Sequence, residues 1–110
     1  MRLPENPLGS LEHIVLLAVM RLGSGAYGMT VRREIENIAR RDISIGAVYA
    51  TLVRLESKGF IKSHSGEPTP ERGGRAKRYF RMTIQGEGVL RNTHEVIQKM
   101  SAGLKGLQAT

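Results

Sequence analysis

The chain has 110 residues, with 17 lysines and arginines against 10 acidic residues, a formal net charge of +7 and no cysteine. This length predicts one domain with a single core. The lack of cysteine excludes disulfides, thiolate metal sites and cysteine nucleophiles. The charge favours a polyanionic partner over a small acidic substrate, although a basic surface that only aids solubility would give the same balance.

Residues 1–9 are expected to form an N-terminal arm that lacks the apolar segment of a signal peptide. Ser10 is the expected N-cap of a first helix. Apolar residues then follow at helical spacing: Leu11, Ile14, Val15, Leu17, Ala18, Val19 and Leu22. Residues 14–20 are all apolar, so this helix needs cover on more than one side. The run is too short to span a bilayer, and we expect a cytoplasmic protein without a membrane partner.

The stretch GSGAYG at 23–28 predicts a turn after the first helix. A second, amphipathic helix follows this turn and is expected to end at the RRD stretch, residues 40–42. Ser44 is the expected N-cap of a third helix, about 14 residues and roughly 21 Å long. Its apolar stripe is Val48, Leu52 and Leu55. Gly59 stands where a left-handed helix end is expected.

Two short segments, 60–65 and 76–83, are predicted to pair as strands of a hairpin. The connection between them, GEPTPERGGR, is too rich in proline and glycine for regular structure. Phe80 and Met82 alternate on the face expected to meet the core. Five basic residues and no acidic one lie between 72 and 81, which predicts a cationic hairpin.

Thr83 is the expected cap of a last helix of about 24 residues, within a C-terminal segment 84–110. Leu90, Ile97 and Leu104 are seven residues apart, and Met100 and Leu107 each lie three beyond one of them, an imperfect heptad seam. Self-association would cover this seam; folding back on the same chain is the alternative. The chain thus divides into the arm 1–9, a domain 10–83 with three helices and the hairpin, and a dimerisation helix 84–110.

This order of elements predicts a mainly α fold with a minor α+β character, the winged helix-turn-helix. In it the third helix, about 44–58, enters the major groove, and the wing, about 60–83, lies on the backbone or minor groove. Residues 10–83 are therefore expected to be a winged-helix DNA-binding domain. Three small residues lie opposite the buried stripe: Gly46, Ala47 and Ala50. They would let the helix backbone approach the bases closely; the alternative is that they are present only because they suit a helix. Tyr49 flanks this face, as a phosphate ligand or as a packing residue. The predicted DNA-binding residues are Ser44, Gly46, Ala47, Tyr49, Ala50, Arg54, Arg75, Lys77 and Arg78.

The stretches SIGAVYATLVRLESKGFI at 44–61 and GRAKRYFRMTIQGEGVL at 74–90 resemble the PadR family of transcriptional regulators. The match consists of Gly46, Val48-Tyr49, Leu52, Leu55, Gly59, Ile61, Tyr79 or Phe80, Thr83 and Gly86, with AYG at 26–28. The resemblance covers about residues 8–107 and implies a homodimer that presents two recognition helices to a palindromic operator in double-stranded DNA. The single C-terminal helix is similar to the smaller PadR subfamily, which includes multidrug-responsive repressors.

Drug-sensing relatives of this kind hold planar ligands between aromatic rings at the dimer interface. This chain has no tryptophan, and its five aromatic residues lie outside the first and last helices, which argues against stacking of a flat drug. An aliphatic effector pocket lined by Val15, Val96, Ile97 and Met100 is the alternative. The residues do not require an effector.

No enzyme or cofactor motif is recognised. The three histidines, His13, His64 and His94, lack metal-ligand spacing, and the GSG turn lacks the rest of a phosphate-binding loop. We therefore expect no catalytic residue, metal or cofactor. The leading prediction is a sequence-specific dimeric DNA-binding regulator, a repressor. A non-specific nucleic-acid-binding architectural protein and a winged-helix protein-interaction adaptor are the alternatives.

Overall fold

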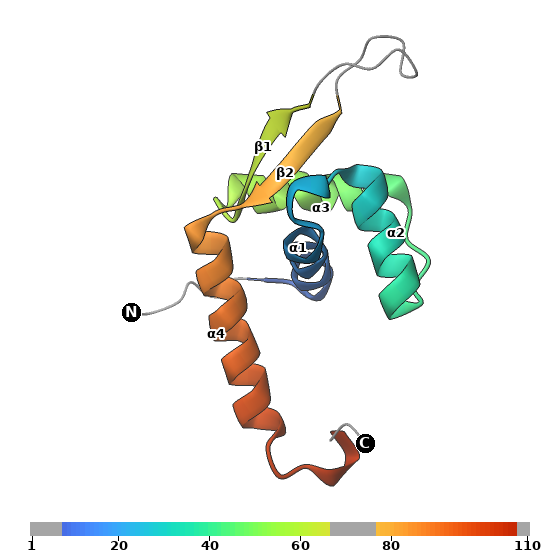
Figure 1. The fold of residues 1–110 in the computed structure, drawn as a ribbon. Coiled ribbons are helices and arrows are strands. Elements are labelled where there is room, and N and C mark those ends of the chain that lie inside the picture. Colours follow the sequence, from blue (N-terminus) through green and yellow to red (C-terminus); the bar gives the residue numbers. More distant parts are fainter. Residues whose placement is uncertain (1–7, 67–76, 108–110) are drawn as a thin grey trace.

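The computed structural model describes residues 8–66 and 77–107. In chain order the elements are α1 (Ser10–Leu22), a 3-10 turn (Gly23–Gly25), α2 (Gly28–Ala39), α3 (Ile45–Ser57), β1 (Ile61–Ser65), β2 (Arg78–Met82), α4 (Ile84–Ser101) and a second 3-10 turn (Lys105–Leu107). Helices α1 to α3 pack together, the β1–β2 hairpin rises from one side of them, and α4 runs away from the other side (Figure 1). The predicted winged helix-turn-helix is confirmed.

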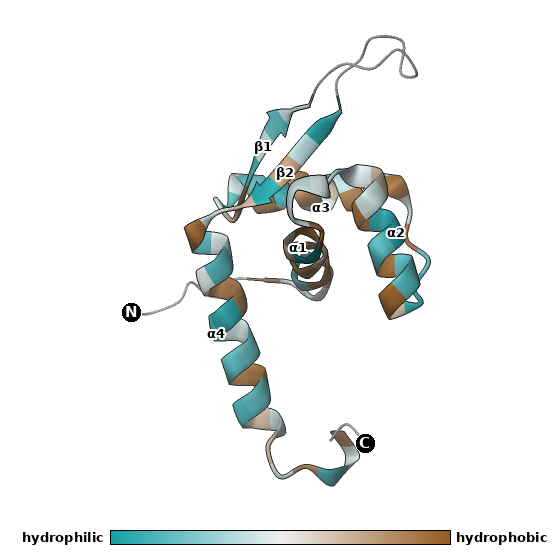
Figure 2. Cartoon of the chain, viewed as in Figure 1, coloured by the Kyte–Doolittle hydropathy of each residue, from teal (hydrophilic) through white to brown (hydrophobic). Residues whose placement is uncertain are grey.

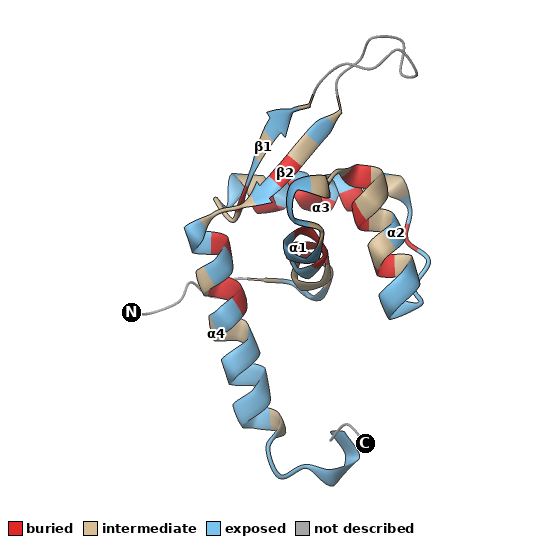
Figure 3. Ribbon diagram, viewed as in Figure 1, coloured by how far each residue is buried: buried red, intermediate tan, exposed pale blue. Residues whose placement is uncertain are grey.

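The core forms around α1. Val15, Leu16 and Val19 of this helix are almost fully buried, as is the predicted α3 stripe of Val48, Leu52 and Leu55. Phe80 of β2 closes the core from the hairpin side, and Met82 packs at its edge. Figure 2 shows the apolar character of α1, and Figure 3 shows where burial lies: inside the three-helix body and at the first turns of α4.

The predicted caps hold at α3 and α4. The Ser44 hydroxyl accepts a hydrogen bond from the N–H of Ala47 at 3.1 Å, and the Thr83 hydroxyl accepts one from the N–H of Gly86 at 3.0 Å. The prediction for Ser10 is wrong, because Gly9 is the N-cap and Ser10 the first helical residue. The carboxylate of Glu12 reaches back to the N–H of Gly9 at 2.7 Å, so the first turn caps itself.

The end of α3 follows the sequence prediction. Gly59 has φ +83°, a left-handed conformation that favours glycine. Its N–H donates to the carbonyl of Glu56, and the N–H of Phe60 donates to the carbonyl of Leu55, both at 3.0 Å. This pair of bonds is a Schellman motif, and it turns the chain from α3 directly into β1.

The two wing strands pair antiparallel, with Ile61 opposite Met82 and Ser65 opposite Arg78. This confirms the predicted hairpin, although β1 is one residue and β2 three residues shorter than the predicted segments. Phe80 lies opposite Ser63 and is the buried residue of β2, as its alternation predicted. The tip of the predicted wing lies outside the described residues.

The prediction of a last helix of about 24 residues is wrong, because α4 has 18. Helix α4 ends at Ser101, Gly103 has φ +80°, and Leu104 begins a turn that leads to Lys105–Leu107. Two glycines, Gly103 and Gly106, follow the end of α4. A glycine lowers the stability of a helix by about 1 kcal/mol relative to alanine, so these residues disfavour its continuation. Leu104 and Leu107 therefore do not continue the α4 stripe.

Candidate nucleic-acid interface

The outward face of α3 carries small residues in its N-terminal half. Gly46 and Ala50 are exposed, and among the described residues no heavy atom lies within 4 Å of the place where a Cβ on Gly46 would stand. Val53, with half of its surface exposed, and Ser57 continue this face toward the C-terminal end. Sequence reasoning missed both, although the helical period that placed Gly46 and Ala50 on this face also places them there.

Three other predicted residues of α3 have structural roles as well. Ser44 is exposed and caps the helix. Ala47 is half-buried and packs against the core. Tyr49 is 42% exposed, yet its ring lies over the first residue of α2: a Cβ on Gly28 would come within 2.4 Å of Tyr49 Cζ. The packing interpretation of Tyr49 is supported, while its contact with DNA stays a prediction.

Arg54 is held at the edge of this face. Its guanidinium donates to the Thr51 hydroxyl at 3.2 Å, and its Nε lies 3.7 Å from Glu12 Oε2. Thr51 is fully buried and itself donates to the carbonyl of Ala47 at 2.8 Å. The side chain of Arg54 is still about half exposed, so its guanidinium is oriented by α1 and α3 while it remains accessible.

A polar network joins the wing to α3. The Arg78 guanidinium donates to Glu56 Oε1 at 2.6 Å and to the Ser63 hydroxyl at 3.2 Å. The other oxygen of Glu56 accepts the N–H and the hydroxyl of Ser63 at 3.1 and 2.6 Å. One carboxylate on α3 thus binds both strands of the hairpin, and Arg78, predicted as a DNA ligand, is already engaged by Glu56 and Ser63.

Of the two remaining predicted wing cations, the structure describes Lys77. Lys77 precedes β2, and its ammonium donates to the hydroxyl of Tyr27 at 3.2 Å. Arg75 lies outside the described residues. Arg81 and Lys62 are exposed and face each other across the hairpin. The described part of the wing therefore keeps the cationic character that the sequence predicted.

Two carboxylates of these networks have shifted pKa values. Burial would raise the pKa of Glu12, but the Gly9 N–H, the Lys58 ammonium and the charge of Arg54 outweigh it and hold that pKa below 4.5. The hydroxyl of Ser63 is the main cause of the lowered pKa of Glu56; burial opposes it, and the N–H of Ser63 and Arg78 add to it. Both groups are thus held ionised by the contacts that fasten α3.

The structure also brings together two histidines that the sequence left apart. Burial lowers the pKa of His13 on α1, and the nearby charge of His94 on α4 lowers it further. Within residues 8–66 and 77–107, no group of three or more histidine, aspartate or glutamate side chains could hold a metal ion. No helix in this part of the chain has the length and apolarity needed to cross a membrane.

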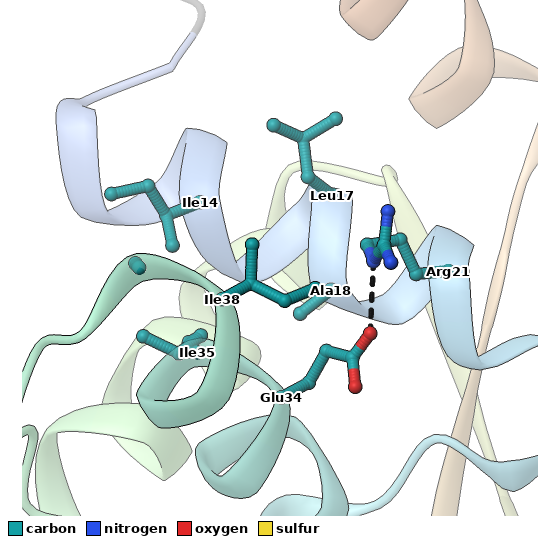
Figure 4. A pocket seen from close by; sticks show the side chains of 8 residues that line it. Ile14, Leu17, Ala18, Arg21, Glu34, Ile35 and Ile38 are labelled. Atoms are coloured by element: carbon teal, nitrogen blue, oxygen red, sulfur yellow. Dashed lines mark hydrogen bonds and ion pairs between the residues drawn. The ribbon is translucent and has the colours of Figure 1, made fainter.

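One of the four residues predicted to line an effector pocket, Val15, is buried in the core instead. Val15 has no exposed surface and belongs to the core, because it lies on the inner side of α1. Val96, Ile97 and Met100 are exposed on α4. An apolar groove of about 340 Å³ lies elsewhere, between α1 and α2. Figure 4 shows Leu17 and Ile38 at its walls and the 2.8 Å ion pair of Arg21 and Glu34 at its rim.

The predicted dimerisation seam is also divided. Leu90 is buried in the core of its own chain, because only the first turns of α4 pack against the three-helix body (Figure 3). Ile97 and Met100 are exposed on the projecting part of α4, and Leu104 and Leu107 are exposed beyond its end. Leu90 is therefore unavailable to a partner, and a role for the other four stays a prediction.

Comparison with known proteins decides the family. The sequence model of the transcriptional regulator PadR-like family matches residues 16–92, which is well over half of the chain. The chain belongs to the PadR-like family. This confirms the resemblance of residues 44–61 and 74–90, and the family is one of transcriptional regulators rather than enzymes.

Solved structures with this fold include other PadR-like proteins. A PadR family transcriptional regulator from Eggerthella lenta DSM 2243 is 25% identical, with 88% of this chain and 84% of that one covered and a TM-score of 0.68. A PadR-like transcriptional regulator from Bacillus cereus strain ATCC 14579 is 18% identical, with coverage of 97% and 100% and a TM-score of 0.72. No curated protein sequence matches the chain.

A further solved structure shares the fold as well. F93 from STIV, a winged-helix DNA-binding protein, is 22% identical, with 83% of this chain and 90% of that one covered and a TM-score of 0.64. Together with the family match, this makes the chain a PadR-like transcriptional regulator with the winged-helix fold of DNA-binding proteins.

Proposed function

We propose that this PadR-like chain is a dimeric repressor that binds a palindromic operator, with α3 in the major groove and the wing on the adjacent backbone or minor groove. The observation that carries the proposal is the outward face of α3. Gly46 and Ala50 leave it without bulk, so the helix backbone can approach base edges closely, and an alanine methyl can pack on a thymine methyl.

The surroundings of α3 fit this use. Arg54 stands at one edge of the face and Tyr49 at the other. The carboxylate of Glu56 fastens the cationic wing to the same helix. Helix and wing would therefore meet DNA as one unit, in which α3 supplies base contacts and the wing supplies phosphate contacts that position the protein.

The proposed dimer would cover apolar surface that one chain leaves open. Leu17 and Met20 of α1 are 42% and 51% exposed, and Met100 of α4 is 75% exposed. These exposed apolar side chains on two helices are the surface that a partner chain would cover. Symmetric pairing through α1 and α4 would bring two α3 helices into half-sites about one helical turn, ~34 Å, or a multiple of it apart.

The direct test is selection of bound duplexes from a random DNA pool at ~150 mM salt, followed by sequencing. An enriched inverted repeat is the expected result. Retained DNA without an enriched sequence would indicate a non-specific architectural protein. No retained DNA would contradict DNA binding and leave a protein-interaction adaptor.

Two variants and a salt series make this test specific for α3. Ala50→Glu should abolish retention, because it places a negative charge on the face that enters the groove. Asn37→Asp adds the same charge at the exposed C-terminal end of α2 and should bind almost normally. If the dimer neutralises ~6 to 10 phosphates, affinity should fall about 10³- to 10⁵-fold between 50 and 200 mM salt.

A further inference from the structure

The segment before α2 is joined to the wing by backbone contacts. Tyr27 is the N-cap of α2 in extended conformation, and it forms an isolated antiparallel bridge with Tyr79 of β2. The N–H of Phe80 donates to the carbonyl of Ala26 at 2.9 Å. Residues 26–27 therefore connect the start of α2 to β2 of the hairpin.

The side chain of Tyr27 holds a lysine on the wing. Lys77 Nζ lies 4.4 Å from the centroid of the Tyr27 ring and donates to the Tyr27 hydroxyl at 3.2 Å. The ring is itself fixed by an edge-to-face contact with Tyr79 at 5.2 Å between centroids. The ring of His64 stacks on that of Tyr79, with 5.9 Å between the two centroids.

These contacts reduce the conformational entropy that the Lys77 side chain would lose on binding a phosphate. A lysine side chain carries about 2 kcal/mol of rotamer entropy, and a long side chain that is ordered only on binding costs affinity. Lys77 is half-buried, and both the ring and the hydroxyl of Tyr27 restrict where its ammonium stands. A cation over an aromatic face also keeps its charge and its remaining N–H donors.

We propose that Tyr27 is a positioning residue for DNA binding: it holds the Lys77 ammonium beside the start of β2, ready to contact a backbone phosphate. The inference rests on the proposed function, because it gives Lys77 a DNA phosphate as its ligand. Tyr27 acts through Lys77 and through the bridge to β2. It needs no contact with DNA itself.

A merely structural role for Tyr27 makes a different prediction, and a double-mutant cycle separates the two. The probe is a duplex obtained by the selection above. Tyr27→Leu should weaken binding about threefold to tenfold in the native background and less than twofold in Lys77→Ala. It should also lower the salt slope by about 0.9, the value for one phosphate, as Lys77→Ala does. Equal losses in both backgrounds would overturn the proposal.

Conservative variants check that the fold is intact. Tyr27→Phe keeps the ring and loses only the hydroxyl bond, so it should retain most of the affinity that Tyr27→Leu loses. His64→Ala removes another ring of the same cluster and keeps the Tyr27–Lys77 contact, so its affinity should stay within about twofold of the native value. A loss with His64→Ala as large as that with Tyr27→Leu would contradict positioning by Tyr27.

A second measurement does not depend on DNA. In the free protein, the side-chain methylene protons of Lys77 should show an upfield ring-current shift in NMR spectra, which Tyr27→Leu removes. Absence of that shift in the native chain would overturn the proposal. If the shift is present but no duplex is retained by the native protein, the contact stands and the proposed function fails, and with it the phosphate role of Lys77.

Discussion

Lys58 Nζ lies 2.9 Å from Glu12 Oε1, so the C-terminal end of α3 is tied to the first turn of α1 by residues 46 positions apart. Glu12 as a whole is only 6% exposed. Its carboxylate also accepts a hydrogen bond from the N–H of Gly9 and faces Arg54. One buried carboxylate in α1 therefore helps to orient the candidate recognition helix, in addition to its apolar stripe.

Replacing Glu12 by glutamine should lower the free energy of unfolding by about 1 to 3 kcal/mol at pH 7, because a charged hydrogen-bond acceptor in a buried position becomes neutral. Urea unfolding monitored by circular dichroism measures this difference. Glu95→Gln is the matched control: Glu95 is exposed on α4, and its substitution should change stability by less than about 0.5 kcal/mol.

The Glu12 contribution should depend on pH with a defined sign. The pKa of Glu12 is lowered in the folded state, so the folded chain binds fewer protons there than the unfolded chain. Its stabilisation is complete above the unfolded pKa and is lost as the pH falls through the lower folded pKa. The free energies of unfolding of the native chain and of Glu12→Gln should therefore converge as the pH falls below 4.5. A constant difference down to pH 3 would contradict this role.

Gly86 should not tolerate a side chain, whereas Gly88 should. A Cβ on Gly86 would stand 2.1 Å from the carbonyl oxygen of Phe60, a backbone atom, while among the described residues nothing lies within 4 Å of a Cβ on Gly88. Gly86→Ala should cost about 1 to 3 kcal/mol, and Gly88→Ala should stabilise α4 by up to about 1 kcal/mol. Equal unfolding midpoints for the two variants would show that α4 can move away from Phe60.

The parts of the fold that could be predicted are those that local physics determines. Val48, Leu52 and Leu55 repeat with the period of a helix, Ser44 and Thr83 can cap one, and Gly59 adopts the positive φ that ends α3. These signals lie within a few residues of the feature they specify. The order of helices and strands then leaves few topologies.

Contacts between distant segments could not be predicted in the same way. Glu12 looks like an exposed first-turn acid in the sequence, and only packing of α1 against α3 buries it beside Lys58. Leu90 fits a heptad seam as well as a core position, and the place where α4 meets α1 decided for the core. Tyr27 gave no sequence signal for its contact with Lys77, 50 residues away.

Replacing Gly46 by alanine tests how closely α3 approaches DNA. The site is open in the free chain, so the variant should fold normally, with a stability equal to or up to about 1 kcal/mol above the native value. Affinity for the selected duplex should nonetheless fall, because the added methyl stands on the groove face. Gly88→Ala is the control for the helix effect alone. Unchanged affinity of Gly46→Ala would remove this part of α3 from the interface.

Arg54→Ala should reduce discrimination rather than affinity for every sequence. Thr51 and Glu12 orient the guanidinium at the edge of the α3 face, and a bidentate contact with a guanine is worth about 1 to 3 kcal/mol of selectivity. Binding to duplexes with each base pair substituted in turn measures it. Arg33→Ala, on the exposed side of α2, controls for lost charge. A uniform loss on all duplexes would make Arg54 a phosphate ligand.

Ile97→Glu should convert the proposed dimer into monomers. Ile97 is about half exposed on the part of α4 that projects from the domain, so a charge there should leave the chain folded while opposing burial against a partner. Sedimentation velocity over a range of concentrations measures the mass. Lys99→Glu places the same side chain about 200° around α4 and should leave the association unchanged. A native mass for Ile97→Glu would exclude this face of α4 from the dimer, and a monomeric native chain would contradict the dimer altogether.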